Sequence, residues 1–317
     1  MVARVVTAAN PEKLLVVLLG PTASGKTALS LALAQQFHGE IISCDSVAVY
    51  RGLDLGSAKP TQAEQSLVPH HLIDLRTPDQ PYTAGDYARD SRAALADIAS
   101  RNRLPIVTGG TGLYLRALLL GLSDAPPRSD ALRNRLRAEE QSNPGHLHRQ
   151  LAQLDPAAAA AIHPNDTPKL IRALEVSLLT RQPLSSTWLA GREPLTGYKT
   201  LRIGLDAPRS ALYERINARA AQMFADGLID ETRSLAAQYG EGCRALTSLG
   251  YAQALAVLRN QLLLEQAVAA AQQGHRNYAK RQMTWFRREP DVHWLSGFGD
   301  SPDISAQALA LVHAALA

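Results

Sequence analysis

The feature that most restricts the fold of this chain is a glycine-rich segment near its N-terminus. The segment consists of Gly20, Pro21, Thr22, Ala23, Ser24, Gly25, Lys26 and Thr27. It matches the pattern GxxxxGK[ST], follows an apolar run at residues 14–19 and opens a segment of helical period at 27–36. In this context the glycines let backbone N–H groups surround phosphate oxygens at a helix N-terminus. The segment therefore predicts a loop that binds a di- or triphosphate, with Lys26 on the outer phosphates and Thr27 as a ligand of Mg²⁺.

Apolar runs alternate with helix-length spacers through the first part of the chain. The runs lie at residues 14–19, 40–44, 71–75 and 104–108, and another follows at 201–206. The clearest helical segments between the first four runs are 27–36 and 84–101. Strands that are apolar on both faces and separated by helices are typical of a parallel sheet covered on both sides. We therefore predict an α/β fold with a P-loop-type parallel sheet.

The texture of the sequence changes after residue 121. A polar, proline-containing linker at 124–129 is followed by helical segments at 132–141, 146–154, 156–162 and 169–180. We predict an all-α domain inserted into the sheet domain, with residues 1–122 and 199–317 as the two parts of the core and 123–198 as the insertion. Further helices are predicted at 210–226, 228–238, 251–259, 264–273 and 275–288.

Composition excludes several classes of protein. Lys and Arg number 33 against 29 Asp and Glu, and the net charge of +4 permits an anionic partner without identifying one. The two cysteines, Cys44 and Cys243, form no CxxC pair, which argues against a disulfide framework and a structural zinc site. No apolar run reaches the ~18 residues of a membrane span, and no signal peptide is recognisable. We expect a cytoplasmic, monomeric protein that does not enter the membrane.

Two further positions carry candidate chemistry at the edge of the predicted sheet. Asp45 and Ser46 follow the second predicted strand, so they are expected beside the phosphate loop. The Asp45 carboxylate can either hold Mg²⁺ through water or accept a proton from a nucleophile. Gly109 and Gly110, before Thr111, either bring the backbone close to a ligand or simply form a tight turn.

Six segments together resemble a known family. They are GPTASGKT from Gly20, ISCDS from Ile42, VYRGLDLGSAKP from Val49, VTGGTGLYLRALLLGL from Val107, IHPND from Ile162 and YAKRQMTWFRR from Tyr278. In this order the chain resembles the tRNA dimethylallyltransferases, also called tRNA isopentenyltransferases. The resemblance implies transfer of a dimethylallyl group from dimethylallyl diphosphate to the exocyclic 6-amino group of the adenosine 3′ of the anticodon. It also implies tRNAs that read codons starting with U, and release of diphosphate.

The resemblance gives each part of the site a role. The phosphate loop would hold the diphosphate leaving group with Mg²⁺, and no phosphoryl group would move. Asp45, by its match to the family's DS motif, would take the proton from the adenine amine. Thr111 would bind the amine or the diphosphate, beside Lys26 and Thr27. Arg219 resembles the arginine that reaches the diphosphate from the far side; Arg215, one helical turn away, is the alternative, and a solvated helix surface would also explain both.

The resemblance also implies contacts with the anticodon stem-loop of tRNA. The matching residues are Asp45, Ser46, Val47, Ala48, Thr111, Pro168, Lys169, Leu170, Ile171, Arg172, Thr247, Ser248, Leu249, Gly250 and Tyr251. Tyr251 either stacks on a base or is a buried tyrosine. Many family members have Gln where this chain has Ala48, so a base contact by that amide is absent here. A base in a single-stranded loop is the least costly to extract from its stack.

Basic residues offer RNA-facing surfaces in two places. Residues 275–288 interleave Arg276, Lys280, Arg281, Arg287 and Arg288 with Tyr278, Trp285 and Phe286, although rings at this spacing are also typical of a core. Arg133, Arg135 and Arg137, with Lys169 and Arg172, form a second basic surface or else pair with Glu139 and Glu140.

Two rival functions use the same loop differently. A small-molecule kinase would take ATP, the default ligand of this motif, and an RNA-binding ATPase would hydrolyse it without transferring a group. The sequence lacks the guanine-binding motif NKxD, which argues against a GTPase. No predicted strand ends in a convincing Walker-B aspartate.

Overall fold

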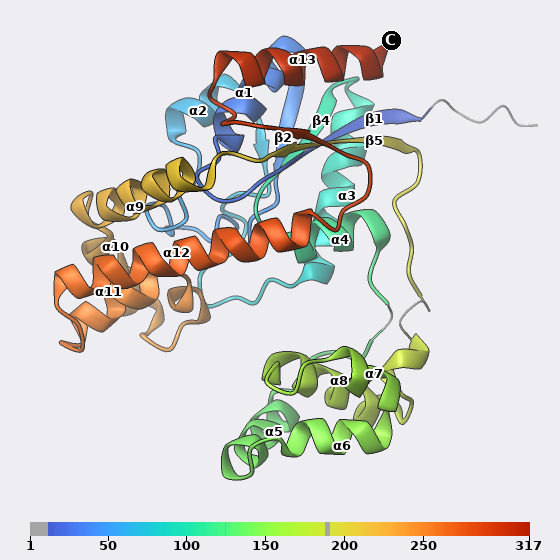
Figure 1. The fold of residues 1–317 in the computed structure, drawn as a ribbon, viewed down its shortest axis with the longest axis vertical. Helices are drawn as coiled ribbons and strands as arrows, with labels where there is room; N and C mark the ends of the chain where they lie inside the picture. Colours follow the sequence, from blue (N-terminus) through green and yellow to red (C-terminus); the bar gives the residue numbers. More distant parts are fainter. Residues whose placement is uncertain (1–11, 124, 188–190) are drawn as a thin grey trace, which may run out of the picture. The chain divides into compact units, whose positions relative to one another are not determined.

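The computed structural model describes residues 12–123, 125–187 and 191–317. The chain forms two compact units: the first runs to Leu119 and resumes over Leu195–Ala317, and the second is Leu120–Pro194 (Figure 1). No helix in these residues is long and apolar enough to cross a membrane.

The first unit is built on a parallel sheet. Among the described residues its strands are β1 (Lys13–Leu19), β2 (Gly39–Ser43), β3 (His70–His71), β4 (Leu104–Thr108), β5 (Tyr198–Leu205) and β6 (Val292–Leu295). They lie in the order β3-β2-β4-β1-β5-β6, and every pair is parallel. In the centre, Val16 of β1 is in register with Ile106 of β4 and Leu201 of β5. The predicted α/β fold class is therefore confirmed.

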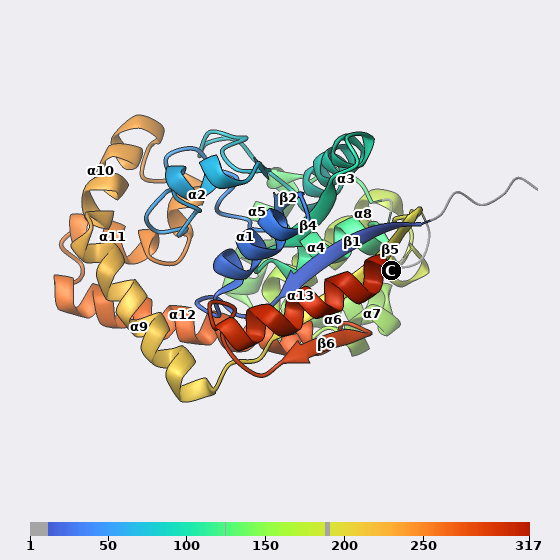
Figure 2. The same cartoon turned by 90° about the horizontal axis from the view of Figure 1, so that it is seen from above.

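Helices cover both faces of this sheet (Figures 1 and 2). The helices of the first unit are α1 (Lys26–Gln36), α2 (Gln62–Leu67), α3 (Ala84–Ser100), α4 (Gly112–Leu120), α9 (Arg209–Ala225), α10 (Leu228–Tyr239), α11 (Tyr251–Leu258), α12 (Leu264–Phe286) and α13 (Pro302–Leu316), with a 3-10 turn η2 (Arg244–Thr247). Val16 and Leu18 pack with α1 and α13, whereas Leu15 and Val17 pack with α3 and α4. Burial on both faces explains why β1 is a continuous apolar run.

Two predicted elements differ from the structure. The break predicted between 264–273 and 275–288 is wrong, because α12 continues through Gly274. A Cβ at Gly274 would lie 2.7 Å from Leu249 Cδ2, so this glycine permits a close contact and does not end the helix. The strand predicted at 71–75 is limited to His70–His71, since Leu72 and Asp74 have φ of 63° and 55°, outside the extended region. The prediction missed α2, α4, β6 and α13.

The second unit consists of helices in its described residues. They are α5 (Asp130–Ser142), α6 (His146–Leu154), α7 (Pro156–Ala161) and α8 (Thr167–Thr180), followed by the 3-10 turn η1 (Leu184–Thr187). Leu136, Leu147, Leu151 and Leu174 form its core and are fully buried. The structure thus has helices where the sequence predicts an all-α insertion, in a unit bounded at Leu120–Pro194 and not at 123–198.

A buried carboxylate ties α5 to α8 in this unit. Glu175 is 0% exposed and accepts hydrogen bonds from Arg133 at 2.8 and 2.7 Å, from Arg172 at 2.6 Å and from Ser129 N at 2.8 Å. Burial opposes its ionisation, but the bonds from Arg133, Ser129 and Arg172 outweigh burial and lower the pKa of Glu175 to about 2.

A Glu175→Gln variant is expected to destabilise the helical unit by ~3 kcal/mol, because it leaves two arginines without their buried counter-charge. Because the pKa falls from an ordinary 4.5 to about 2, the native carboxylate stabilises the fold above pH 4.5 and loses this effect as the pH falls toward 2. Hydrogen exchange of the α5–α8 amides in the full-length protein measures both effects. Glu139→Gln, at an exposed pair with Arg135, is the control; equal protection in the two variants would contradict the expectation.

Candidate functional site

The phosphate loop has the strand–loop–helix geometry that its sequence predicts. It joins β1 to α1, and Gly25 has a φ of 86°, which favours glycine. A Cβ at Gly25 would lie 2.8 Å from Gly299 N, so the segment after β6 packs directly behind the loop. Lys26 crosses the loop, and its Nζ donates to Gly20 O at 2.9 Å and to Pro21 O at 2.7 Å.

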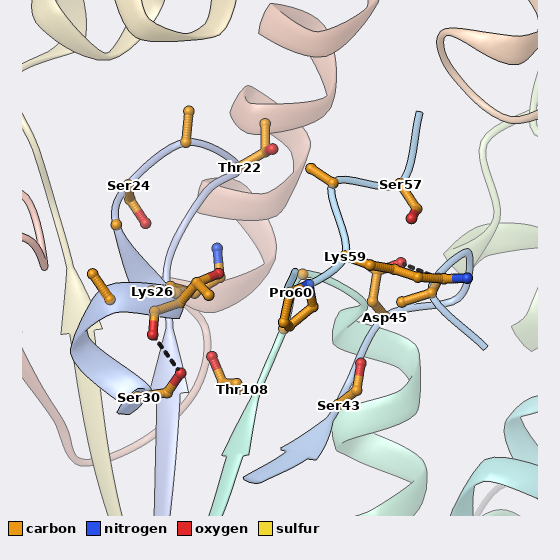
Figure 3. A pocket seen from close by; sticks show the side chains of 18 of the residues that line it. Thr22, Ser24, Lys26, Ser30, Ser43, Asp45, Ser57, Lys59, Pro60 and Thr108 are labelled. Carbon is orange, nitrogen blue, oxygen red and sulfur yellow. Dashed lines mark hydrogen bonds between the residues drawn. The ribbon is translucent and has the colours of Figure 1, made fainter. Parts of the chain in front are cut away.

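A pocket of about 420 Å³ opens beside this loop within the first unit. Its walls are residues 22–28 of the phosphate loop and α1, the ends of β2 and β4, residues 57–60, and side chains from α9 and α12. Figure 3 shows Lys26 on one side of the pocket and Asp45 on the other. The sheet edge therefore brings the two predicted reactive groups into one cavity, as expected for groups at the carboxyl ends of parallel strands.

Asp45 lies just after β2 with one carboxylate oxygen engaged. Its Oδ1 accepts hydrogen bonds from Val47 N at 2.8 Å and Ala48 N at 3.3 Å, which form a tight turn. Both hydrogen bonds described for this carboxylate use Oδ1. The half-buried Asp45 thus has a fixed orientation and a second oxygen for a substrate proton.

Thr111 is fastened to the residues on either side of Asp45. Thr111 N donates to Cys44 O at 3.1 Å, and Thr111 Oγ1 accepts from Ser46 N at 3.1 Å. A Cβ at Gly109 would lie 2.2 Å from Cys44 O, so this glycine allows the two loops to touch. The pocket wall at this point is formed by Gly109 and Gly110.

The two arginines of α9 have different partners. Arg219 donates to Thr22 Oγ1 in the phosphate loop and lines the pocket. Burial lowers the pKa of Arg219, whereas the nearby Asp45 raises it. Arg215 forms hydrogen bonds with both oxygens of Asp300, at 2.9 and 2.8 Å, and its guanidinium lies 3.7 Å from the centre of the Phe298 ring. Arg215 and Asp300 also line the pocket, but of the two arginines it is Arg219 that contacts the phosphate loop, whereas Arg215 is paired with Asp300.

The Lys26 side chain has a pKa close to neutral pH. Burial and then the charge of Arg219 lower its pKa to about 7, against the opposite effects of Asp45 and Cys44. Below pH 7 the lysine is already protonated, whereas above pH 7 it must take up a proton when an anion binds. We therefore expect diphosphate affinity to fall as the pH rises above 7, by up to ~10-fold per unit.

Calorimetric titration with inorganic diphosphate at pH 8, in buffers of different ionisation enthalpy, measures this proton uptake. The uptake should be smaller in a Lys26→Met variant. Equal uptake in both proteins would show that the proton goes to another group.

The segments predicted to contact tRNA are only partly exposed. Pro168, Lys169 and Thr247 are exposed, whereas Ala48, Leu170, Ile171, Gly250 and Tyr251 are buried, the last completely. The Tyr251 hydroxyl donates to Glu231 at 2.5 Å, so the buried alternative holds for this ring. In this structure, these five buried residues therefore offer almost no surface to RNA.

In the two predicted basic surfaces, some residues are exposed and others are buried or paired with acidic residues. Lys280, Arg281, Arg287 and Arg288 of and after α12 are exposed, whereas Phe286 is core. The Arg116 guanidinium lies 4.7 Å from the centre of the half-buried Trp285 ring. In the second unit, Arg133 and Arg172 pair with Glu175, and Arg135 pairs with Glu139 at 3.5 Å.

Two residues that shape the pocket were not singled out from the sequence. Lys59, with a side chain 4% exposed, contacts Asp54 at 2.9 Å and Asp74 at 2.5 Å, and so anchors the wall at 57–60. Gln282 of α12 contacts both the phosphate loop and the Gly109–Gly110 turn. Both lie in segments that carried the family resemblance, but no periodicity or spacing marks them as parts of a site.

The described residues contain no cluster of three or more His, Cys, Asp or Glu side chains that could hold a metal ion. Thr27 lines the pocket, and its hydroxyl suits Mg²⁺, which takes few protein ligands when phosphate oxygens are present.

Three comparisons with known proteins agree on one family. The sequence model described as IPP transferase matches residues 48–289. A tRNA dimethylallyltransferase of Koribacter versatilis is 61% identical over 302 residues, 95% of this chain and 98% of that one. The full-length tRNA isopentenylpyrophosphate transferase of Bacillus halodurans has a TM-score of 0.69 and 38% identity over 96% of both chains. A eukaryotic dimethylallyltransferase, solved acting on tRNA, has a TM-score of 0.79 and 26% identity, over 96% of this chain and 79% of that one. The chain therefore belongs to the IPP transferase family.

Proposed function

We propose that the chain transfers a dimethylallyl group from dimethylallyl diphosphate to the 6-amino group of the adenosine 3′ of the anticodon in tRNA. The enzyme class follows from relatives named tRNA dimethylallyltransferase, and the kinase alternative is not favoured. The observation that carries the chemistry is one pocket with the phosphate loop on one side and Asp45 on the other.

The phosphate loop would bind the diphosphate of the donor. Lys26 and Arg219 place positive charge beside backbone N–H groups, where negative charge develops as the carbon–oxygen bond breaks. Thr27 would hold Mg²⁺, which supplies further stabilisation of the leaving group. Ala58, Pro60 and Ile73 line the same pocket and offer apolar surface for the five-carbon group.

Asp45 would act as the general base. The adenine amine is a weak nucleophile because its lone pair is delocalised into the ring. As its nitrogen bonds to C1 of the dimethylallyl group and diphosphate leaves, one amine proton passes to the Asp45 carboxylate. Thr111, bonded on both sides of Asp45, would fix the loop that carries this base.

Exposed cations would hold the anticodon stem-loop through its phosphates. Lys280, Arg281 and Arg288 line an open groove on α12, and Lys169 is exposed on α8. We also propose tRNAs that read codons starting with U as substrates, a cytoplasmic reaction and a monomeric enzyme.

Mass spectrometry of nucleosides from unmodified tRNA tests this function. The tRNA is incubated with the protein, Mg²⁺ and either dimethylallyl diphosphate or ATP. We expect one C₅H₈ unit to be added to the adenosine next to the anticodon when dimethylallyl diphosphate is supplied, and no such addition when ATP is supplied instead. ATP consumption without an adduct would instead favour the kinase or ATPase reading.

A further inference from the structure

Gln282 is buried in α12 and contacts both loops that bound the pocket. Only 4% of the Gln282 surface is exposed to solvent. Gln282 Oε1 accepts a hydrogen bond from Thr22 N at 2.8 Å, and Gln282 Nε2 donates to Gly110 O at 3.0 Å. A single amide group therefore joins the phosphate loop to the turn after β4.

The turn at Gly110 leads directly to the surroundings of the proposed base. The next residue, Thr111, donates from its N to Cys44 O at 3.1 Å and accepts from Ser46 N at its Oγ1 at 3.1 Å. Cys44 and Ser46 flank Asp45 in the sequence. A continuous series of hydrogen bonds thus connects the loop for the leaving group with the residue for the proton.

The chemistry of this position calls for an amide. Thr22 N needs an acceptor and Gly110 O needs a donor, and a glutamine side chain presents one of each in a plane. A Cβ at Gly110 would lie 2.0 Å from Gln282 Nε2, so the glycine is what lets the amide reach the backbone. Tyr278, one turn earlier in α12, donates to the same carbonyl at 3.2 Å.

We propose that Gln282 is a positioning residue that sets the distance between the diphosphate in the phosphate loop and the carboxylate of Asp45. The proposal rests on the role of Asp45 as base. Transfer needs the donor carbon, the attacking nitrogen and the base in one geometry, and a misplacement of about 1 Å can cost ~10²-fold in rate. Gln282 itself touches protein backbone and acts through the two loops.

Two substitutions of Gln282 test the hydrogen bonds that its amide makes with the two loops. Gln282→Glu keeps an acceptor for Thr22 N but replaces the donor to Gly110 O, and Gln282→Met keeps the length of the side chain and removes both bonds. We expect the single-turnover rate with saturating donor and tRNA to fall ~10- to 100-fold in Gln282→Met. Gln282→Glu places an acceptor oxygen against Gly110 O and should be at least as slow. In Gln282→Met the Kd values of dimethylallyl diphosphate and tRNA should change less than ~3-fold. Ala271→Gly, buried in the same helix, should lower the unfolding temperature without this loss of rate.

A double-mutant cycle with Asp45→Asn separates positioning from general loss of structure. Once the base is removed, there is nothing for Gln282 to align with the donor, so Gln282→Met should then have little further effect. Equal rate losses in both backgrounds, or a lower unfolding temperature with an unchanged rate, would overturn the proposal. The Asp45→Asn single variant tests the base separately. Undiminished transfer by this variant would overturn the assignment of Asp45 as base, whatever the Gln282 variants do.

Discussion

An Asp45→Asn variant is expected to transfer the dimethylallyl group ~10²- to 10⁴-fold more slowly than the native chain, with nearly unchanged affinity for tRNA. The amide keeps an Oδ1 that can accept from Val47 N and Ala48 N, so the turn after β2 is retained. What is lost is the carboxylate that accepts the amine proton. Single-turnover transfer and a separate measurement of tRNA binding check the two halves of this expectation.

Asp45→Ala removes both the base and the acceptor of the turn. We expect it to be at least as slow as Asp45→Asn, because the position of the loop at Ser46 is then less restricted. Loss of tRNA binding in Asp45→Asn, with undiminished turnover of the tRNA that still binds, would contradict a role as base. Such a result would move Asp45 into substrate binding.

Lys26→Met is expected to lower kcat/KM for dimethylallyl diphosphate ~10²- to 10³-fold, the usual effect of removing one group that stabilises a developing anion. Methionine keeps the length of the side chain but has no charge and no donor for phosphate oxygens. The native ammonium lies within the loop, bonded to Gly20 O and Pro21 O, so it is held where the leaving group would bind. Both kcat and donor affinity should fall, whereas tRNA affinity should not.

The matched control for this variant is Lys199→Met. Lys199 is exposed near the start of β5, at the opposite end of the strands from the phosphate loop. It should leave kcat/KM unchanged. Comparable losses in both lysine variants would indicate an effect of net charge on tRNA or donor association, and the role of Lys26 in the pocket would then be wrong.

Local pattern was sufficient for the fold class and for part of the site. The phosphate loop could be located because its strand, glycines and helix are contiguous in the sequence. Asp45 could be placed beside it because parallel strands end at one edge of a sheet. Patterns failed at Gly274, which lies inside α12 against Leu249 and does not end the helix, and at Leu72, where a positive φ ends a strand.

The sequence by itself therefore determined the parallel sheet, the inserted helical unit and the phosphate loop, which depend on short-range periodicity and spacing. Only the tertiary structure decided that Tyr251 is core, that Arg219 and not Arg215 meets the phosphate loop, and that Gln282 bridges two loops. Gln282 and Thr22 are 260 positions apart. A contact of this kind leaves no local pattern, because it depends on where distant segments are packed and not on the residues beside it.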